Sequence, residues 1–280
     1  MILVIGAGGK VGTPAVQRLL DKGLVVRALT RDPAKMAGVW PGVEAVTGDL
    51  DRPETLPPAF EGVDAALVIS AGNDIAGEDT NAIDAATAAG VDRLVLLSSQ
   101  GVIANVASGP FHAAGEERLR ASALSWTILR PAIFMANAAQ WRDTIKAQGA
   151  FYEPTGTGAH AMIHPSDIGE VAAEVLASPG HVGQTYELTG PEAITSADCA
   201  AALSAALGTE VRHVDIPDEA FRQAMAGFGA PPVLIDSLSR YFAMVRVGDF
   251  AHVSPAVADI LGRPGRTFRD WAVENAAVFG

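Results

Sequence analysis

A glycine-rich turn that directly follows a short apolar run is the feature that most constrains the fold of this chain. The run covers Ile2 to Ile5, the turn covers Gly6 to Gly12, and helical apolar spacing begins at Val16. Glycines allow positive φ and a close approach of the backbone to a ligand, and free N–H groups at a helix start favour negative charge there. This context predicts a dinucleotide site with G-x-x-G-x-x-G spacing, contributed by Gly6, Gly8, Gly9, Lys10, Val11 and Gly12. The alternative is a turn whose glycines serve packing alone.

Further short apolar runs alternate with stretches of helical spacing through the first half of the chain. The runs that we expect as strands are 24–29, 43–46, 65–69, 94–97 and 126–129. Continuous apolar runs of this length are typical of parallel strands that are buried on both faces. The pattern predicts an α/β fold of the Rossmann type, with a doubly wound parallel sheet in residues 1–150 and a return segment near 161–190.

From about residue 190 the sequence becomes mainly helical. Helix starts are predicted at Thr195-x-x-Asp198 and at Thr267-x-x-Asp270, and Ser254 before Pro255 marks another helix that ends at Gly262. We expect residues 191–280 to form a smaller, mainly helical substrate lobe. Pro and Gly gather at 153–158 and 227–232, which are therefore predicted loops, and the second is a candidate lid.

Charge and composition exclude several classes of partner. Lys and Arg number 20 against 32 Asp and Glu, a net charge of −12, so we expect no nucleic-acid partner. No apolar run approaches the roughly 18 residues of a membrane span, so we expect no membrane partner. The single cysteine, Cys199, cannot form an internal disulfide and fits a reducing compartment, which favours the cytoplasm.

The end of the second predicted strand bears on the choice of cofactor. The chain there contains Thr30, Arg31, Asp32 and Pro33. Asp32 before Pro33 is typical of a helix cap, which leaves Arg31 to contact a ribose 2′-phosphate, with Lys10 and Lys35 nearby. This favours NADP(H) as the cofactor, while NAD(H) remains possible. The alternative is that Arg31 is a solvated surface charge and does not contact the cofactor.

Several segments together resemble a known family. They are Gly6–Gly12, Arg27–Asp32, Gly48-Asp49-Leu50, Leu97-Ser98-Ser99, His112–Ser122, Trp126–Pro131 and Asp167-Ile168-Gly169. Over about residues 1–180 the chain resembles the NmrA-like group of atypical short-chain dehydrogenases/reductases. The resemblance implies that Asp49 and Leu50 border the adenine, that Ser70, Ala71 and Gly72 line the cofactor, and that Pro131, Ala132 and Ile133 approach the nicotinamide. Thr30 and Ser98 lie in matched segments and are further candidate cofactor contacts.

The chain departs from the wider superfamily in its catalytic pair. Typical members use Y-x-x-x-K, in which the tyrosine passes a proton to the carbonyl oxygen. Here Tyr152, Tyr186 and Tyr241 are followed four residues later by Gly156, Gly190 and Val245. If the superfamily's K-x-x-x-E spacing is laid on His112 and Glu116, His112 takes the lysine position and Ser108 the tyrosine position. Alcohol oxidation by tyrosine chemistry is therefore disfavoured.

Hydride transfer to a quinone or another conjugated small-molecule electrophile remains as a possible reaction. It depends more on the position of the substrate above the nicotinamide than on a dedicated acid. The resemblance to the quinone-reductase branch implies the same NADPH-dependent chemistry. The candidate catalytic residues are His112 and Ser99, and the candidate substrate contacts are Gln100, Phe134, Trp141 and Tyr152. His112 has a structural alternative at a helix start, and the aromatic residues have one in the core. The rival function is a non-catalytic NADP-binding redox sensor that acts through a protein partner.

Other titratable residues are interpreted structurally. His160 and His164 are four apart, but Pro165 argues against a helix there, so we expect no metal site. Asp167 with Glu170 has the spacing of a capping box. Arg130 is expected to pair with a carboxylate, and Cys199 is expected to be a buried, inert thiol.

Overall fold

A central sheet of seven parallel strands organises the first part of the molecule. The computed structural model describes residues 1–36, 39–106 and 108–280. The strand order is β3-β2-β1-β4-β5-β6-β9. Their bounds are β1 (Ile2–Ile5), β2 (Val26–Thr30), β3 (Glu44–Thr47), β4 (Ala65–Val68), β5 (Arg93–Leu97), β6 (Ser125–Pro131) and β9 (Gln184–Leu188). Since β1 leads outward to β2 and β4 leads outward to β5, the strand order reverses between β1 and β4, where ligands bind in open α/β sheets.

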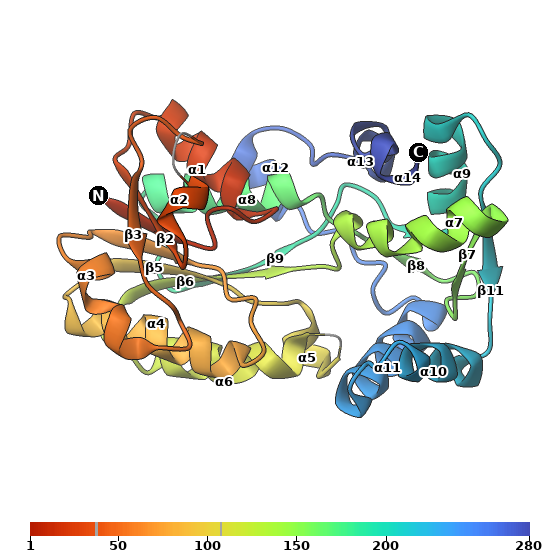
Figure 1. Ribbon diagram of the computed structural model, residues 1–280, viewed down its shortest axis with the longest axis horizontal. Coiled ribbons are helices and arrows are strands. Elements are labelled where there is room, and N and C mark those ends of the chain that lie inside the picture. Colours follow the sequence, from red (N-terminus) through yellow and green to blue (C-terminus); the bar gives the residue numbers. More distant parts are fainter. Residues whose placement is uncertain (37–38, 107) are drawn as a thin grey trace.

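Helices cover both faces of this sheet (Figure 1). One face carries α1 (Gly12–Asp21), α8 (Pro165–Ala177) and α12 (Ala256–Leu261), and the other carries α3 (Pro57–Phe60), α4 (Ile75–Ala88) and α6 (Gly109–Arg120). The connections include α2 (Pro33–Met36), η1 (Pro53–Thr55) and α5 (Gly101–Ala104). Each face has its own apolar core, so the predicted doubly wound α/β fold is confirmed.

The predicted apolar runs correspond to strands, with one difference in burial. Glu44, Ala45 and Thr47 of β3 are exposed, whereas we expected strands buried on both faces. The reason is position: β3 is the edge strand and pairs only with β2.

A second lobe lies beyond the carboxyl end of β6 (Figure 1). It contains two small sheets, β8 with β10 and β7 with β11, among helices. The elements are η2 (Met135–Trp141), α7 (Arg142–Gln148), β7 (Ala150–Glu153), β8 (Ala159–His160), β10 (Ile194–Thr195), α9 (Ser196–Leu207), β11 (Arg212–Asp215), α10 (Asp218–Gly227), α11 (Pro232–Val247), α13 (Phe268–Glu274) and α14 (Ala276–Phe279). One apolar core joins Met135 and Phe151 to Cys199 and Phe268, so packing crosses the boundary expected at residue 150.

Helix starts were predicted with mixed success. Thr195 and Thr267 form complete capping boxes with Asp198 and Asp270, which confirms both. The capping box predicted for Asp167 and Glu170 is wrong. His164 caps α8 by accepting from the Ser166 amide, whereas both carboxylates bind guanidinium groups of Arg263 and Arg266.

The positions of the histidines and the lengths of the helices bear on two of the expectations from the sequence, those about a metal site and about a membrane span. His160 lies in β8 and not on a helix with His164. No group of three or more His, Cys, Asp or Glu side chains among the described residues is arranged to hold a metal ion. Within the same residues, the helices are too short or too polar to cross a membrane.

Candidate functional site

The glycine turn between β1 and α1 is shaped by contacts that only glycine allows. Gly6 has φ +78°, and a Cβ there would lie 2.9 Å from the Ile69 carbonyl oxygen at the end of β4. A Cβ at Gly12 would lie 2.1 Å from the Gly6 oxygen. By contrast, a Cβ at Gly9 would meet only the Gly6 oxygen, at 3.2 Å. Gly6 and Gly12 are therefore required by the turn itself, and Gly9 leaves the space above the turn open.

The turn presents unused amide groups at the start of α1. The Gly9 amide donates to the Gly6 oxygen at 3.0 Å, while the amides of Gly8, Lys10 and Val11 donate to no described residue. Gly8, Gly9 and Lys10 are exposed. Free amides at a helix N-terminus beside the point where the strand order reverses fit the pyrophosphate of a dinucleotide.

The ends of β2 and β3 provide the next candidate contacts. The Asp32 carboxylate accepts from the Ala34 amide at 3.1 Å, so it caps α2 as predicted. Arg31 and Lys10 are exposed, and neither forms an ion pair with a described residue. The Lys35 side chain lies outside the described residues. Both cations are thus available to a phosphate beside the turn.

Polar contacts fix the residues that follow β3. The Asp49 amide donates to Thr55 Oγ1 at 3.0 Å, and the Leu50 carbonyl accepts from Asn81 Nδ2 at 2.8 Å. Thr30 Oγ1 is held by the Asp32 amide. These bonds make the rim of the sheet a preformed surface.

The loop after β4 is held by two consecutive acids of α4. The Glu78 carboxylate accepts from the amides of Ala71 and Gly72, at 3.1 and 3.0 Å. The Ser70 hydroxyl donates to Asp79 Oδ1 at 2.7 Å. These two amides and this hydroxyl are therefore engaged within the chain, so the loop can line the cofactor through its surface and not through them.

His112 lies in α6, where it faces Asp79. Its side chain is buried, and its Nδ1 lies 3.6 Å from Asp79 Oδ2. Sequence reasoning missed Asp79. The available signal was its position in the helical pattern, because it shares the buried side of α4 with Ala82, Ile83 and Ala86. An acid on an apolar helix face needs a partner or a function.

Glu116 is the centre of a second buried polar cluster at the end of β5. It accepts from the Ser98 hydroxyl at 2.5 Å, from Arg130 at 2.6 and 2.8 Å, and from Arg120 at 2.8 Å. Burial raises the pKa of this carboxyl, but the hydrogen bonds from Arg130, Ser98 and Arg120 outweigh it and hold the pKa below its ordinary value. The expected pairing of Arg130 with a carboxylate is found.

The remaining polar candidates have structural partners. Ser99 Oγ accepts from the Gly101 amide at 3.2 Å, at the start of α5. The backbone amide of Gln100 donates to the Pro131 carbonyl at 2.9 Å, and this hydrogen bond does not involve the Gln100 side chain. Pro131 and Ala132 are buried, while Ile133 is half-buried and its carbonyl accepts from Ile163.

The predicted aromatic residues do not form one pocket wall. Trp141 is buried, stacks on Phe151 with ring centres 3.9 Å apart, and donates to Glu153 at 3.1 Å. It belongs to the core of the second lobe because its partners enclose it. Tyr152 is exposed and its hydroxyl bonds to Gln148. Phe134 alone lies between the cores of the two lobes.

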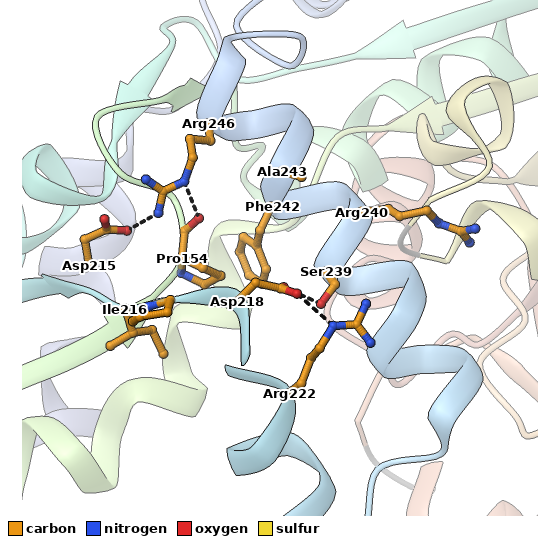
Figure 2. Close-up of a pocket in the computed structure, with 11 residues that line it drawn as sticks. Pro154, Asp215, Ile216, Asp218, Arg222, Ser239, Arg240, Phe242, Ala243 and Arg246 are labelled. Atoms are coloured by element: carbon orange, nitrogen blue, oxygen red, sulfur yellow. Dashed lines mark hydrogen bonds and ion pairs between the residues drawn. The ribbon is translucent and has the colours of Figure 1, made fainter. Parts of the chain in front are cut away.

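A pocket of about 790 Å³ lies on the second lobe, away from these candidates (Figure 2). It is lined mainly by α11 and by the connection from β11 to α10. Two of its arginines are already paired, Arg246 with Asp215 at 2.6 Å and Arg222 with Asp218 at 2.7 Å. It contains none of the predicted cofactor or substrate residues, so the candidate functional site is the glycine turn together with the neighbouring strand ends.

Comparisons with known proteins show the family to which the chain belongs. Residues 6–179 match a family model described as NAD(P)H-binding. The sequence is 38% identical to an NAD(P)H azoreductase of Xenophilus azovorans, over 100% of this chain and 99% of that protein. The structure resembles an NADPH-dependent quinone oxidoreductase of Escherichia coli solved with NADPH, with TM-score 0.88 and 27% identity, over 98% and 99% of the two chains. A triphenylmethane reductase of a Citrobacter species gives TM-score 0.85 and 25% identity, over 98% of each chain.

Proposed function

Because the chain belongs to the NAD(P)H-binding family that its residues 6–179 match, we propose that it is an NADPH-dependent reductase of quinone-like or other conjugated small molecules. The observation that carries this proposal is the set of free amides on the glycine turn, at the point where the strand order reverses. They supply a site for a dinucleotide, and the bound nicotinamide supplies hydride.

The residues around the turn give the cofactor its proposed contacts. The amides of Gly8, Lys10 and Val11 bind the pyrophosphate, Gly9 keeps that space open, and Gly6 and Gly12 allow the turn itself to form. Arg31 and Lys10 bind a 2′-phosphate, which favours NADP(H), while NAD(H) remains usable. The other proposed contacts are Thr30, Asp49, Leu50, the surface of the 70–72 loop, Ser98, His112, Pro131, Ala132 and Ile133.

The proposed acceptor is conjugated because the chain lacks the tyrosine–lysine pair. A quinone needs less acid catalysis than an isolated carbonyl group does, since the oxyanion that hydride transfer produces is comparatively stable. The azoreductase and the quinone oxidoreductase, similar over their whole lengths, support an acceptor of this class. We assign Gln100 and Phe134 to substrate contact and His112 to the reacting end. Ser99 stays a weaker candidate because its hydroxyl oxygen already accepts a hydrogen bond from the Gly101 amide.

The reaction is placed in the cytoplasm as part of this proposal. Cys199 is buried and burial raises its thiol pKa well above the ordinary value, which suits an unreactive thiol. The acidic net charge of −12 supports a small-molecule partner over nucleic acid.

NADPH fluorescence tests binding and reduction in one sample. We expect a saturable signal when NADPH is added to the protein, followed by decay when a quinone is supplied. The matched control is Gly9→Val, which should give neither. A saturable signal that stays constant with every quinone would contradict the proposed reductase.

A further inference from the structure

Three polar side chains meet in the interior beside the glycine turn. Ser70 directly follows Ile69, whose carbonyl oxygen would lie only 2.9 Å from a Cβ at Gly6. The Ser70 hydroxyl holds Asp79 Oδ1 at 2.7 Å, and Asp79 Oδ2 points towards His112. The network therefore adjoins the proposed cofactor site at the same edge of the sheet.

Two buried polar atoms of this network lack a hydrogen-bond partner in the described part of the chain. Asp79 Oδ2 and His112 Nδ1 are buried, and neither has a hydrogen-bond partner among the described residues. They lie 3.6 Å apart, so a shift of about half an ångström forms a hydrogen bond between them. Because an unpaired buried carboxylate oxygen is costly, this pairing is favoured.

The packing of α6 against α4 is adapted to this approach. A Cβ at Gly115 would lie 2.4 Å from Asp79 Oδ2, so glycine is needed where α6 passes the carboxylate. Asp79 is fully buried and His112 is 7% exposed. The other ring nitrogen, Nε2, is not among the enclosed unpaired atoms and bonds to no described residue, so it is the nitrogen that a ligand can reach.

We propose that Asp79 is a positioning residue that holds the Nδ1 proton of His112 and directs Nε2 towards the acceptor at the strand ends. Ser70 fixes the orientation of the carboxylate. The inference rests on the proposed reductase function and extends it: His112 supplies the proton that accompanies hydride transfer, in place of the absent tyrosine.

In the proposed step, bound NADPH would supply a hydride to the quinone and be oxidised to NADP⁺, and an electron pair would move onto a quinone oxygen. The Nε2–H bond of protonated His112 breaks, and its proton joins that oxygen to give the hydroquinone. The ring is left neutral with its remaining proton on Nδ1, bound to Asp79, and solvent returns the Nε2 proton.

The tautomer of His112 gives a test that needs no turnover. In ¹⁵N-histidine-labelled protein without cofactor, we expect the neutral His112 ring to carry its proton on Nδ1. Asp79→Asn should move it to Nε2, because an amide can donate to Nδ1. The signal is assigned by its loss in His112→Gln, and Asp84→Asn, an exposed acid of the same helix, is the matched control. A neutral wild-type ring protonated at Nε2, or an unchanged spectrum in Asp79→Asn, would overturn the proposal.

Turnover then separates a proton role from a structural one. A quinone needs a proton with hydride, whereas a cationic triarylmethyl dye is neutralised by hydride alone. We expect Asp79→Asn to lower quinone turnover about 10-fold or more, with dye turnover and NADPH affinity unchanged. Equal losses of turnover with both acceptors would show that Asp79 maintains the fold, and weaker NADPH binding alone would show that it supports binding of the cofactor ribose.

The outcomes also distinguish this inference from the proposed function. Wild-type protein that reduces no acceptor would refute the reductase, while the tautomer measurement would still report on the Asp79 contact. If Asp79→Asn fails to fold, Ser70→Ala removes the other anchor of the carboxylate and should lower quinone turnover more than dye turnover. Unchanged quinone turnover in that variant would count against the network.

Discussion

Arg31 is the residue on which the proposed preference for NADPH depends. It is exposed, follows β2, and has no ion-pair partner among the described residues, so a 2′-phosphate would not compete with an existing salt bridge. The neighbouring acid does not occupy the ribose position of an NAD enzyme, because Asp32 caps α2.

Arg31→Asp should weaken NADPH binding by about 1–3 kcal/mol, the range of a hydrogen bond to a charged group, and should affect NADH less. Titration of both cofactors by fluorescence or calorimetry measures this difference. Arg212→Asp, at an exposed arginine of β11 in the second lobe, is the matched control. Equal NADPH affinity in Arg31→Asp and the wild type would refute the cofactor assignment.

Glu153 is a buried acid in the second lobe whose protonation should affect stability. Burial raises its pKa from 4.5 to about 7, against hydrogen bonds from Trp141 and Ser196 that lower it. The folded protein thus holds this proton to a higher pH than the unfolded chain does. Raising the pH through the window between these values should therefore reduce the free energy of unfolding.

Glu153→Gln should remove this pH dependence while it keeps the acceptor for Trp141. We expect its Tm to match the wild type near the lower end of the window and to exceed it above the upper end, by an amount worth at most about 3 kcal/mol. Thermal melts across the window measure this. A constant Tm difference at every pH would contradict the assignment of the titrating group.

Among the elements, the glycine turn contains one glycine that matters for dinucleotide binding, Gly9, and another that matters for folding, Gly12. The open space at Gly9 and the backbone contacts at Gly12 make opposite predictions for two similar substitutions. Gly9→Val should keep the fold and abolish dinucleotide binding, whereas Gly12→Val should lower stability because its Cβ would meet the Gly6 oxygen. Circular dichroism melts and NADPH titration distinguish them, and retained NADPH binding in a folded Gly9→Val protein would contradict the turn as the cofactor site.

Elements were predicted well where the signal is local. Capping boxes at Thr195 and Thr267 depend on residues three apart, and both formed. Asp167 and Glu170 have similar spacing, but Arg263 and Arg266 lie nearly a hundred residues away and bind both carboxylates. Such long-range partners leave no trace in a local pattern, and the same reason hid the pairing of Asp79 with His112.

On the scale of the whole molecule, this ion-pair cluster ties the C-terminal segment to α8 of the first lobe. Asp167 is fully buried and accepts from both arginines. Asp167→Asn should lower the free energy of unfolding by about 3 kcal/mol, because it removes the fully buried one of the two carboxylates that neutralise these guanidinium groups and leaves only Glu170. Asp143→Asn, at an exposed pair with Arg142, is the control and should change little. Equal melting temperatures for both variants would contradict this role of the cluster.

The fold as a whole was readable from the sequence because buried parallel strands and the glycine turn have strong local patterns. The segments that make up the second lobe could not be read from the sequence. The reason is that β7, which precedes residue 190, pairs with β11, which follows it. Trp141 illustrates the consequence: its position after β6 favoured a substrate contact, with core packing as the alternative, and its stacking on Phe151 places it in the core.

Whether the chain reduces conjugated molecules with NADPH can be measured by following NADPH absorbance with a panel of quinones, enones and dyes. NADH is run alongside with each acceptor. We expect loss of absorbance with at least one acceptor, faster with NADPH than with NADH. Tight, saturable NADPH binding without consumption on any acceptor would contradict this expectation and would indicate a redox sensor that acts through a protein partner.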